Sequence, residues 1–271
     1  MSNLLIHSMT EFSDIILASL QAAGVRNIVE IGAEFGGASQ MLAAYCEVQG
    51  GTLTSIDPAP RAEFTGWAAT RPNVRHVAAA SLDVIHEMTD VDAWVIDGDH
   101  NYYTVINELR GANQVAQAEG KPLLAFLHDV SWPTGRRDMY YAPDRIPAEH
   151  RHEYSYEGGA KIGDRRLFEQ RGFRGMGQFA LATHEGGPRN GVLTAVEDFL
   201  AETRSDARPM AFANIPAVFG LGILFDSNAP WAPSIAQIVH PYHDNPLLAS
   251  LELNRLRNWL EVIEWQDRAA A

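Results

Sequence analysis

Short runs of apolar and β-branched residues alternate with longer helical segments along the first half of this chain. Five such runs are predicted as strands: Asn27–Ile31, Thr52–Ile56, Val74–Val77, Ala93–Ile96 and Leu123–Leu127. Strands that recur between helices form a parallel sheet, because each helix carries the chain back to the same edge of the sheet. We therefore expect an α/β fold with a doubly wound, mostly parallel sheet that has helices on both faces.

Two more strands are predicted late in the chain, at Met210–Ala213 and Leu221–Phe225. Pro216 and Gly220 lie between them and favour a reversal of the chain, so these strands should form an antiparallel hairpin at the edge of a seven-stranded sheet. Apolar residues at helical spacing predict three helices around this core. They run from Glu11 to a stop at Gly24, over Val192–Leu200, and from Leu247 to about Trp265.

Residues 129–190 break the alternation, because they are rich in proline, glycine and aromatic residues and show little periodicity. A segment of this length inside a compact domain is typical of a lid or a binding loop. We expect one domain over residues 1–271, with an acceptor-binding insertion at 129–190. Its aromatic and titratable candidates for contact with an acceptor are Trp132, Tyr140, Tyr141, His150, His152, Tyr154 and Tyr156.

The composition restricts the partners and the cell compartment. With 21 Lys and Arg against 34 Asp and Glu, the formal charge is −13, which predicts no nucleic-acid partner. Cys46 is the only cysteine, which excludes an intramolecular disulfide and favours a reducing, cytoplasmic setting. The N-terminus does not resemble a secretion signal, and no segment approaches the ~20 apolar residues of a membrane helix. We expect a small-molecule acceptor and no membrane partner, and a homo-oligomer stays open.

A glycine loop and an acidic residue suggest a nucleoside site. Gly32 and Gly36 follow the first strand, where glycine lets the backbone turn sharply beside a ligand. Asp57 follows the second strand, where a carboxylate can accept hydrogen bonds from ribose hydroxyls. The other interpretation makes Asp57 the start of an Asp-Pro turn, and both can hold together.

Three stretches carry a family resemblance: Val29-Glu-Ile-Gly-Ala-Glu-Phe-Gly-Gly-Ala-Ser39, Ile96-Asp-Gly-Asp-His-Asn-Tyr-Tyr-Thr-Val105 and Leu127-His-Asp129. With them the chain resembles the class I S-adenosylmethionine-dependent methyltransferases. Within these it looks like the group of macrolide and aminocoumarin sugar O-methyltransferases and cephalosporin-hydroxylase-like proteins. The resemblance implies a Rossmann-like fold and O-methylation of a small-molecule hydroxyl, on a sugar or another natural-product intermediate. It also implies S-adenosylmethionine contacts from Glu30, Gly32 and Gly36 (methionine), Asp57 (ribose), Ser81 with Leu82 (adenine) and Asp97.

Acidic residues and histidines gather at the ends of two strands that should be neighbours. Asp97, Asp99 and His100 follow the fourth strand, and His128 and Asp129 follow the fifth. The resemblance implies a divalent metal on Asp97, His128 and Asp129. Histidine is a poor ligand for Mg²⁺, so either a softer metal such as Mn²⁺, Fe²⁺ or Zn²⁺ binds, or no metal binds and His128 is the base. Asp97, His100 and His128 are the catalytic candidates.

Less specific interpretations of the same residues stay open. Asp97 and Asp99 could cap the following helix, Asp129 could pair with Arg136 or Arg137, and His100 could pack beside Tyr102. The arginine pairs Arg136-Arg137 and Arg165-Arg166 could contact an acidic or phosphorylated substrate or be solvated loop charges. Ser81 could be a helix cap. Asn190 could cap the late helix, or the turn Glu185–Gly191 could line the acceptor pocket. At the level of function, the alternatives are a non-catalytic regulatory or scaffold protein that binds the cofactor, and an NAD-dependent oxidoreductase. Glu34 and Phe35 disfavour the latter, since they stand where the dinucleotide fingerprint requires glycine.

Overall fold

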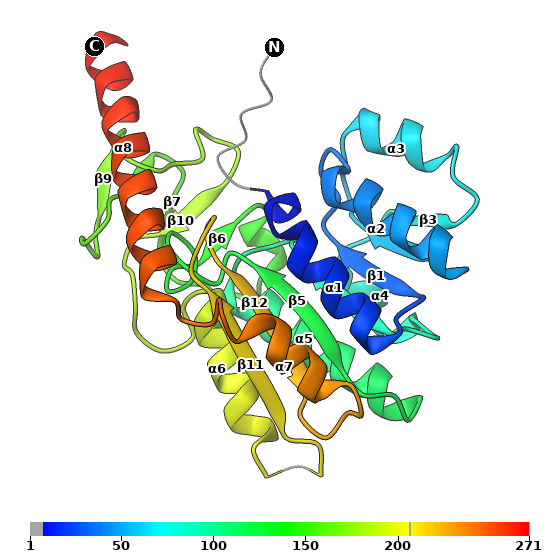
Figure 1. Cartoon of the computed structure of the whole chain (residues 1–271). Helices are drawn as coiled ribbons and strands as arrows, with labels where there is room; N and C mark the ends of the chain where they lie inside the picture. Colours follow the sequence, from blue (N-terminus) through cyan, green and yellow to red (C-terminus); the bar gives the residue numbers. More distant parts are fainter. Residues whose placement is uncertain (1–7, 206, 271) are drawn as a thin grey trace.

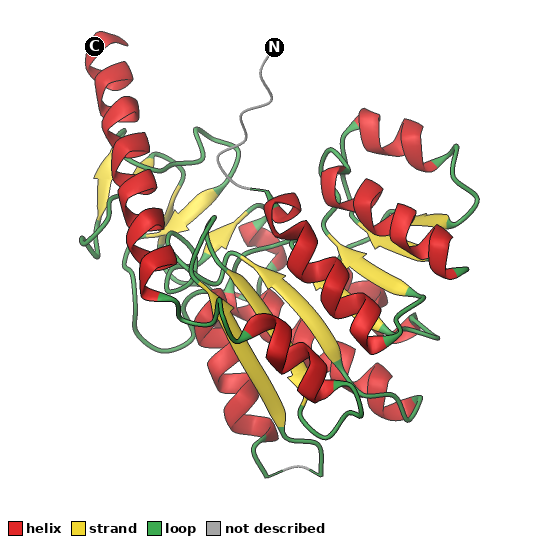
Figure 2. Ribbon diagram, viewed as in Figure 1, coloured by secondary structure: helices red, strands yellow, loops and turns green. Residues whose placement is uncertain are grey.

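The computed structural model describes residues 8–205 and 207–270. The prediction that the N-terminus is not a secretion signal concerns in part Met1–His7, which lie outside the described residues. Its centre is a seven-stranded sheet in the order β11-β12-β5-β4-β1-β2-β3 (Figures 1 and 2). The first five strands in the chain are parallel, and β12 runs antiparallel between β5 and β11. The strands are β1 (Ile28–Ile31), β2 (Leu53–Ile56), β3 (Val74–Val77), β4 (Ala93–Ile96), β5 (Leu124–His128), β11 (Met210–Ile215) and β12 (Leu221–Asp226). The predicted doubly wound sheet and its antiparallel edge hairpin are confirmed.

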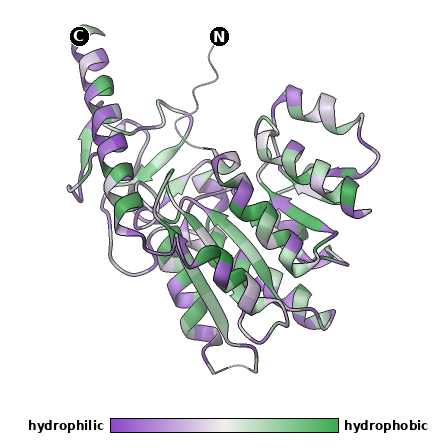
Figure 3. Ribbon diagram, in the orientation of Figure 1, coloured by the Kyte–Doolittle hydropathy of each residue, from purple (hydrophilic) through white to green (hydrophobic). Residues whose placement is uncertain are grey.

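Helices cover both faces of the sheet, and the alternating side chains of each strand divide between two cores. One core packs Val29, Trp94 and Leu127 against the helices α5 (Tyr102–Ala118) and α6 (Val192–Thr203). The other core packs Ile28 and Val95 against α1 (Ser13–Ala23), α2 (Gly37–Gln49) and α7 (Ala232–Val239). Figure 3 shows the mostly hydrophobic strands between helices of mixed character. The helices are α1 (Ser13–Ala23), α2 (Gly37–Gln49), α3 (Ala62–Ala68), α4 (Ser81–Val84), α5 (Tyr102–Ala118), α6 (Val192–Thr203), α7 (Ala232–Val239) and α8 (Pro246–Ala270), with 3₁₀ turns η1 (Met9–Phe12) and η2 (Ile85–Glu87).

Residues 129–190 fold into short strands and turns between β5 and α6. A three-stranded sheet, in the order β6-β10-β7, lies beside a two-stranded sheet of β8 and β9. The elements are β6 (Met139–Tyr140), η3 (Pro143–Arg145), η4 (Ala148–His150), β7 (Tyr154–Ser155), β8 (Gly158–Ala160), β9 (Leu167–Glu169) and β10 (Ala180–Ala182). The role of this segment as a lid stays a prediction.

Buried polar side chains fasten the insertion to the main domain. Asp138 accepts hydrogen bonds from the N–H groups of Tyr102 and Gly191, at 2.7 Å each, and from the Tyr140 hydroxyl at 2.8 Å. The carboxylate thus binds the first residue of α5, Tyr102, and the cap residue of α6, Gly191, whose N–H groups have no partner within a helix. Asn190 was a candidate helix cap, but its side chain instead binds the backbone of Asp138 and of the preceding turn, and Gly191 holds the cap position.

Arg136 and Arg137, near the start of the insertion, both have partners within the protein. Arg137 is fully buried and donates to the carbonyl groups of Ala182 and Arg165. Arg136 forms a bidentate pair with Glu197 of α6 at 2.5 Å. Both therefore hold the insertion on the domain. The expectation of a solvated side chain is wrong for the buried Arg137, whereas the ion pair of Arg136 is partly exposed to solvent.

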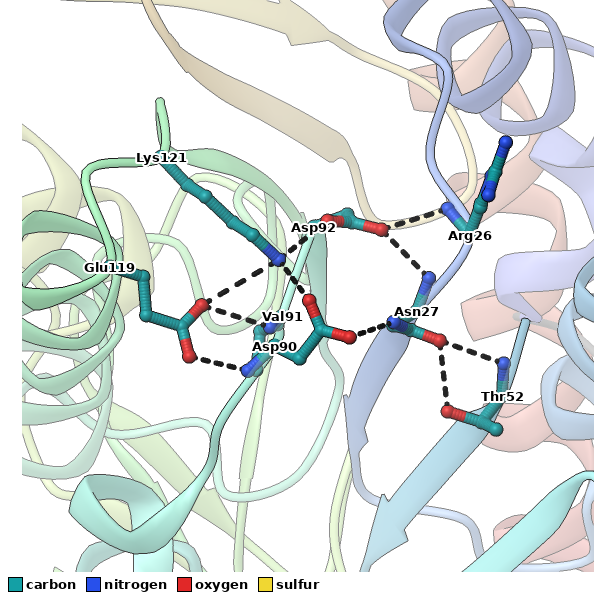
Figure 4. A network of polar contacts seen from close by, with 8 residues as sticks. All are labelled: Arg26, Asn27, Thr52, Asp90, Val91, Asp92, Glu119 and Lys121. Carbon is teal, nitrogen blue, oxygen red and sulfur yellow. Dashed lines mark hydrogen bonds and ion pairs between the residues drawn. The ribbon is translucent and has the colours of Figure 1, made fainter.

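A second polar network lies at the opposite, amino-terminal edge of the sheet (Figure 4). The ammonium group of Lys121 contacts the carboxylates of Asp90 at 2.6 Å and Asp92 at 2.8 Å, and lies 3.6 Å from Glu119. Asp92 accepts the N–H groups of Arg26 and Asn27 just before β1. These contacts tie the starts of β1 and β4 together and have a structural role.

The last helix, α8, lies against the insertion (Figure 1). Its Glu264 pairs with Lys161, and its Asp267 pairs with Arg174. No helix in residues 8–205 and 207–270 is both long enough and apolar enough to cross a membrane.

Candidate active site

The glycine loop after β1 is shaped by its protein neighbours. Gly32 has a φ of +90°, and a Cβ there would lie 2.2 Å from the carbonyl oxygen of Asp97. Gly36 has a φ of +82° at the start of α2, and a Cβ would lie 2.9 Å from the Phe64 ring. Only glycine fits both positions, so the loop lies directly against the end of β4.

Glu30 is buried below this loop with one carboxylate oxygen unpaired. The hydroxyls of Ser39 and Ser55 donate to its Oε2 at 2.6 and 2.7 Å. Its Oε1 is buried and has no hydrogen-bond partner among the residues that the structure describes. Burial raises the pKa of Glu30 to about 7, against the effect of the two serines.

Asp57 at the end of β2 binds the glycine loop itself. Its Oδ2 accepts the N–H groups of Ala33 and Glu34 at 2.9 and 3.1 Å, and its Oδ1 accepts the N–H of Ala59 at 2.8 Å. The contact with Ala59 closes the Asp-Pro turn that the sequence suggested. Asp57 therefore has a structural role. Its Oδ2 already accepts two N–H groups, but its Oδ1 accepts only one and keeps a lone pair for a ligand.

Ser81 begins α4 and does not cap it, since Ala80 holds the cap position. The Ser81 hydroxyl donates to the carboxylate of Glu108, which is fully buried on α5. Burial raises the pKa of Glu108 to about 8, and its Oε2 has no partner in the described chain. Sequence reasoning missed Glu108, although its place on the apolar face of α5, between Val105 and Ala112, was a usable signal.

Two histidine–aspartate pairs meet where β4 and β5 end. The Nδ1 of His128 lies 3.2 Å from Oδ1 of Asp97 and 3.8 Å from Oδ1 of Asp129. The Nδ1 of His100 lies 3.2 Å from Oδ2 of Asp129. The structure thus brings together all the residues that the sequence placed at these two strand ends, with Asp99 beside them.

The less specific interpretations of these residues are corrected. The cap of α5 is Asn101, whose side chain accepts the N–H of Thr104 at 2.9 Å. Asp129 faces His100 and not an arginine, and His100 contacts Asp129 and the Tyr141 ring. Asp129 has a φ of +61°, and its buried Oδ1 has no hydrogen-bond partner among the described residues. A left-handed backbone conformation together with a buried carboxylate oxygen that accepts no hydrogen bond is a feature of functional sites.

His128 is held at both ring nitrogens. Its Nε2 lies 2.9 Å from the carbonyl oxygen of Val218, so this nitrogen carries a proton and donates it. Burial alone would lower the pKa of His128, but the carboxylates of Asp97 and Asp129 outweigh burial and raise it to about 9. The imidazolium therefore compensates the negative charge of the two aspartates at neutral pH.

Asp97, His100 and Asp129 form a possible metal-ligand group. One donor atom from each lies within 4.8 Å of the others. Ligands on opposite sides of a cation with bonds of about 2.1 Å are about 4.2 Å apart, so at most a slight contraction is needed. The sequence predicted His128 as the histidine ligand, whereas His100 is the histidine in this group. His128 instead contacts the carboxylate of Asp97 through its Nδ1.

Among the aromatic candidates of the insertion, Tyr141 lies beside this cluster. Its ring centre is 6.1 Å from that of His100, and its N–H points toward Asp99. Tyr140 is fully buried, with its hydroxyl on Asp138. Trp132 packs on Phe173 and Phe219 in a separate aromatic cluster.

A groove lies between α5, α6 and the insertion. It holds about 490 Å³, and its wall includes Tyr103, His150 and Arg189. The rings of Tyr103 and His150 stack at 4.8 Å. His150 therefore lines this groove. It does not belong to the group of Asp97, His100, His128 and Asp129, which we call the acid–histidine cluster.

Comparisons with known proteins now place the chain. Residues 29–130 match the family model of a methyltransferase domain. Over these residues the chain is similar to a methyltransferase domain. The match covers the glycine loop and the strand ends from β1 to β5, and it favours the methyltransferase interpretation over the NAD-dependent oxidoreductase. The comparison with curated proteins gives no match.

Solved structures, methyltransferases among them, match the chain at low identity and with TM-scores below 0.5. An O-methyltransferase from Bacillus cereus in complex with SAH is 13% identical, covers 83% of this chain and 84% of its own, and has a TM-score of 0.48. A caffeoyl-CoA O-methyltransferase, described as putative, from Staphylococcus aureus is 15% identical, covers 80% and 83%, and has a TM-score of 0.45. A fibrillarin/Nop5p complex is 15% identical with a TM-score of 0.31, and the match spans 40% of this chain and 52% of that one.

Proposed function

We propose that this chain transfers the methyl group of S-adenosylmethionine to a hydroxyl of a small molecule, on a sugar or another natural-product intermediate. The observation that carries the proposal is the contact between the glycine loop and the acid–histidine cluster. Gly32 lies against the backbone of Asp97, whose side chain belongs to the cluster. A donor on the loop and an acceptor at the cluster would therefore be neighbours, as a transfer in line requires.

The donor side has groups suited to the charged and polar parts of S-adenosylmethionine. The unpaired Oε1 of buried Glu30 can accept a hydrogen bond from its ammonium group. Such a partner would also lower the pKa of Glu30, because a nearby cation favours the carboxylate. Asp57 would hold the ribose, and Ser81, positioned by Glu108, would border the adenine.

The acceptor side offers His100 as a proton acceptor in place of His128. If His100 donates its Nδ1 proton to Asp129, its Nε2 keeps a lone pair that can accept the proton of an acceptor hydroxyl. His128, charged and bound at both nitrogens, instead holds Asp97 in place. Tyr141 would cover this side and limit the access of water.

The ligand group also fits a divalent cation. Two carboxylates with one imidazole suit Mn²⁺, Fe²⁺ or Zn²⁺ better than Mg²⁺, and Asp97, His100 and Asp129 would hold the ion. The buried Oδ1 of Asp129, which accepts no hydrogen bond from the described residues, is the observation that favours it. A bound cation would hold the acceptor oxygen and lower the pKa of its hydroxyl.

The test combines binding and turnover. Calorimetry should detect S-adenosylhomocysteine, and Mn²⁺ should raise the melting temperature, since a ligand of the native state stabilises it. Asp129→Asn should abolish the effect of Mn²⁺ and most methyl transfer from labelled S-adenosylmethionine to a panel of phenols and sugars, and should keep S-adenosylhomocysteine binding. Asp99→Asn is the matched control, because Asp99 lies outside the ligand group, and it should keep the effect of Mn²⁺.

Two outcomes would change the proposal. Full methyl transfer in excess EDTA, with loss of transfer in His100→Gln, would remove the metal and leave His100 as the base. Binding of S-adenosylhomocysteine without transfer to any member of the panel would favour the regulatory or scaffold protein. A cytoplasmic location and a homo-oligomer stay predictions.

A further inference from the structure

We infer that Glu252 of α8 is a positioning residue for His128, acting through the strained turn between β11 and β12. The inference rests on the proposed function only for the role of His128, which holds Asp97 in place. The contacts between Glu252, the turn and His128 do not depend on that function. Glu252 is 8% exposed, in a helix whose side chains are otherwise largely exposed or half-buried. An acidic side chain that is buried in a peripheral helix needs specific partners.

The first step of the chain of contacts runs from Glu252 to the turn. Its Oε1 accepts the N–H of Phe219 at 3.0 Å. Arg255, one turn along α8, donates to both carboxylate oxygens at 2.7 Å, and its guanidinium lies 5.7 Å from the centre of the Phe219 ring. Burial alone would raise the pKa of Glu252, but these hydrogen bonds outweigh it and lower the pKa, so the carboxylate is charged.

The second step is the conformation of the turn. Val218, Phe219 and Gly220 have φ values of +46°, +64° and +94°, three consecutive residues in the left-handed region. For a β-branched residue such as Val218 this conformation is unfavourable and persists only when the surroundings hold it. Phe219 is held on both backbone sides, because its carbonyl accepts the N–H of Ser131 at 2.7 Å while Glu252 accepts its own N–H.

The third step leads from the turn to the site. The carbonyl of Val218, one residue before the group that Glu252 binds, accepts the Nε2 proton of His128 at 2.9 Å. This bond determines which nitrogen of the ring faces Asp97 and Asp129. Glu252 therefore fixes the turn, the turn fixes the Val218 carbonyl, and the carbonyl fixes the orientation of His128.

The experiment observes the ring of His128 directly. In the wild-type protein, the Nε2 proton should give a low-field proton NMR signal that exchanges slowly with water and disappears in His128→Gln. Glu252→Ala should broaden or remove the signal, because the Phe219 N–H loses its acceptor. Glu252→Gln keeps an oxygen for this N–H and should retain the signal. Glu264→Ala, which breaks an ion pair of α8 with the insertion, should also retain it.

The kinetic result then follows where methyl transfer is measurable. Loss of an outer contact of this kind lowers activity about 10–100-fold, so kcat should fall in Glu252→Ala with the KM for S-adenosylmethionine unchanged. An unchanged ring signal in folded Glu252→Ala, or equal loss in Glu264→Ala, would overturn the inference. Failure of the proposed function would appear separately, as an absence of methyl transfer in the wild-type protein with the ring signal present.

Discussion

Replacing Asp138 by alanine should strongly destabilise the protein, because one carboxylate serves three buried donors. The N–H groups of Tyr102 and Gly191 and the hydroxyl of Tyr140 would all lose their acceptor. Each unpaired buried donor costs roughly 1–3 kcal/mol, and partial relaxation makes a total loss of about 4 kcal/mol a fair expectation. That is a large share of the roughly 5–15 kcal/mol by which a domain is stable.

Asp138→Asn is the matched variant, because both N–H groups bind the same oxygen, Oδ1. An asparagine can keep this oxygen and turn its amide toward the Tyr140 hydroxyl, so we expect a loss of about 1 kcal/mol. Asp144→Ala, at a side chain that is 98% exposed, should change stability by less than about 0.5 kcal/mol. Urea unfolding followed by fluorescence measures all three. A loss below about 1 kcal/mol in Asp138→Ala would refute the reasoning that these donors depend on Asp138.

Two further predictions concern pH and the donor site. The pKa values of Glu30 and Glu108 are raised to about 7 and about 8. In the unfolded chain both side chains lose their protons near the ordinary glutamate pKa of 4.5, whereas the folded chain keeps these protons to a higher pH. These two carboxyl groups therefore lower the free energy of unfolding as the pH rises from 4.5 to 8. In urea unfolding, Glu108→Gln should become more stable relative to wild type over this range. A difference in unfolding free energy that stays constant with pH would contradict the raised pKa of Glu108. Asp57→Ala should weaken S-adenosylhomocysteine binding in calorimetry by about 1.5–3 kcal/mol, since a charge-assisted hydrogen bond is lost, and unchanged affinity would move the ribose site elsewhere.

Much of the fold could be predicted because its signals are local. Apolar runs such as Val74–Val77 and Ala93–Ile96 coincide with strands, and Gly24 ends α1 in the left-handed conformation, as expected. The position of Asp97 and Asp129 at neighbouring strand ends follows from the parallel order alone, since the carboxyl ends of parallel strands lie at one edge. The convergence of the acid–histidine residues was therefore determined by the sequence pattern.

Only the tertiary structure decided how those residues pair. The sequence favoured His128 as ligand or base, whereas its Nε2 bonds to Val218, from a turn 90 residues later in the chain, and leaves His100 in the ligand group. Glu108 and Glu252 carry no motif, and their roles arise from burial against distant elements. Periodicity records which face of an element is buried, but the partner of each polar group depends on loop conformations and side-chain rotamers that are set by packing between distant segments.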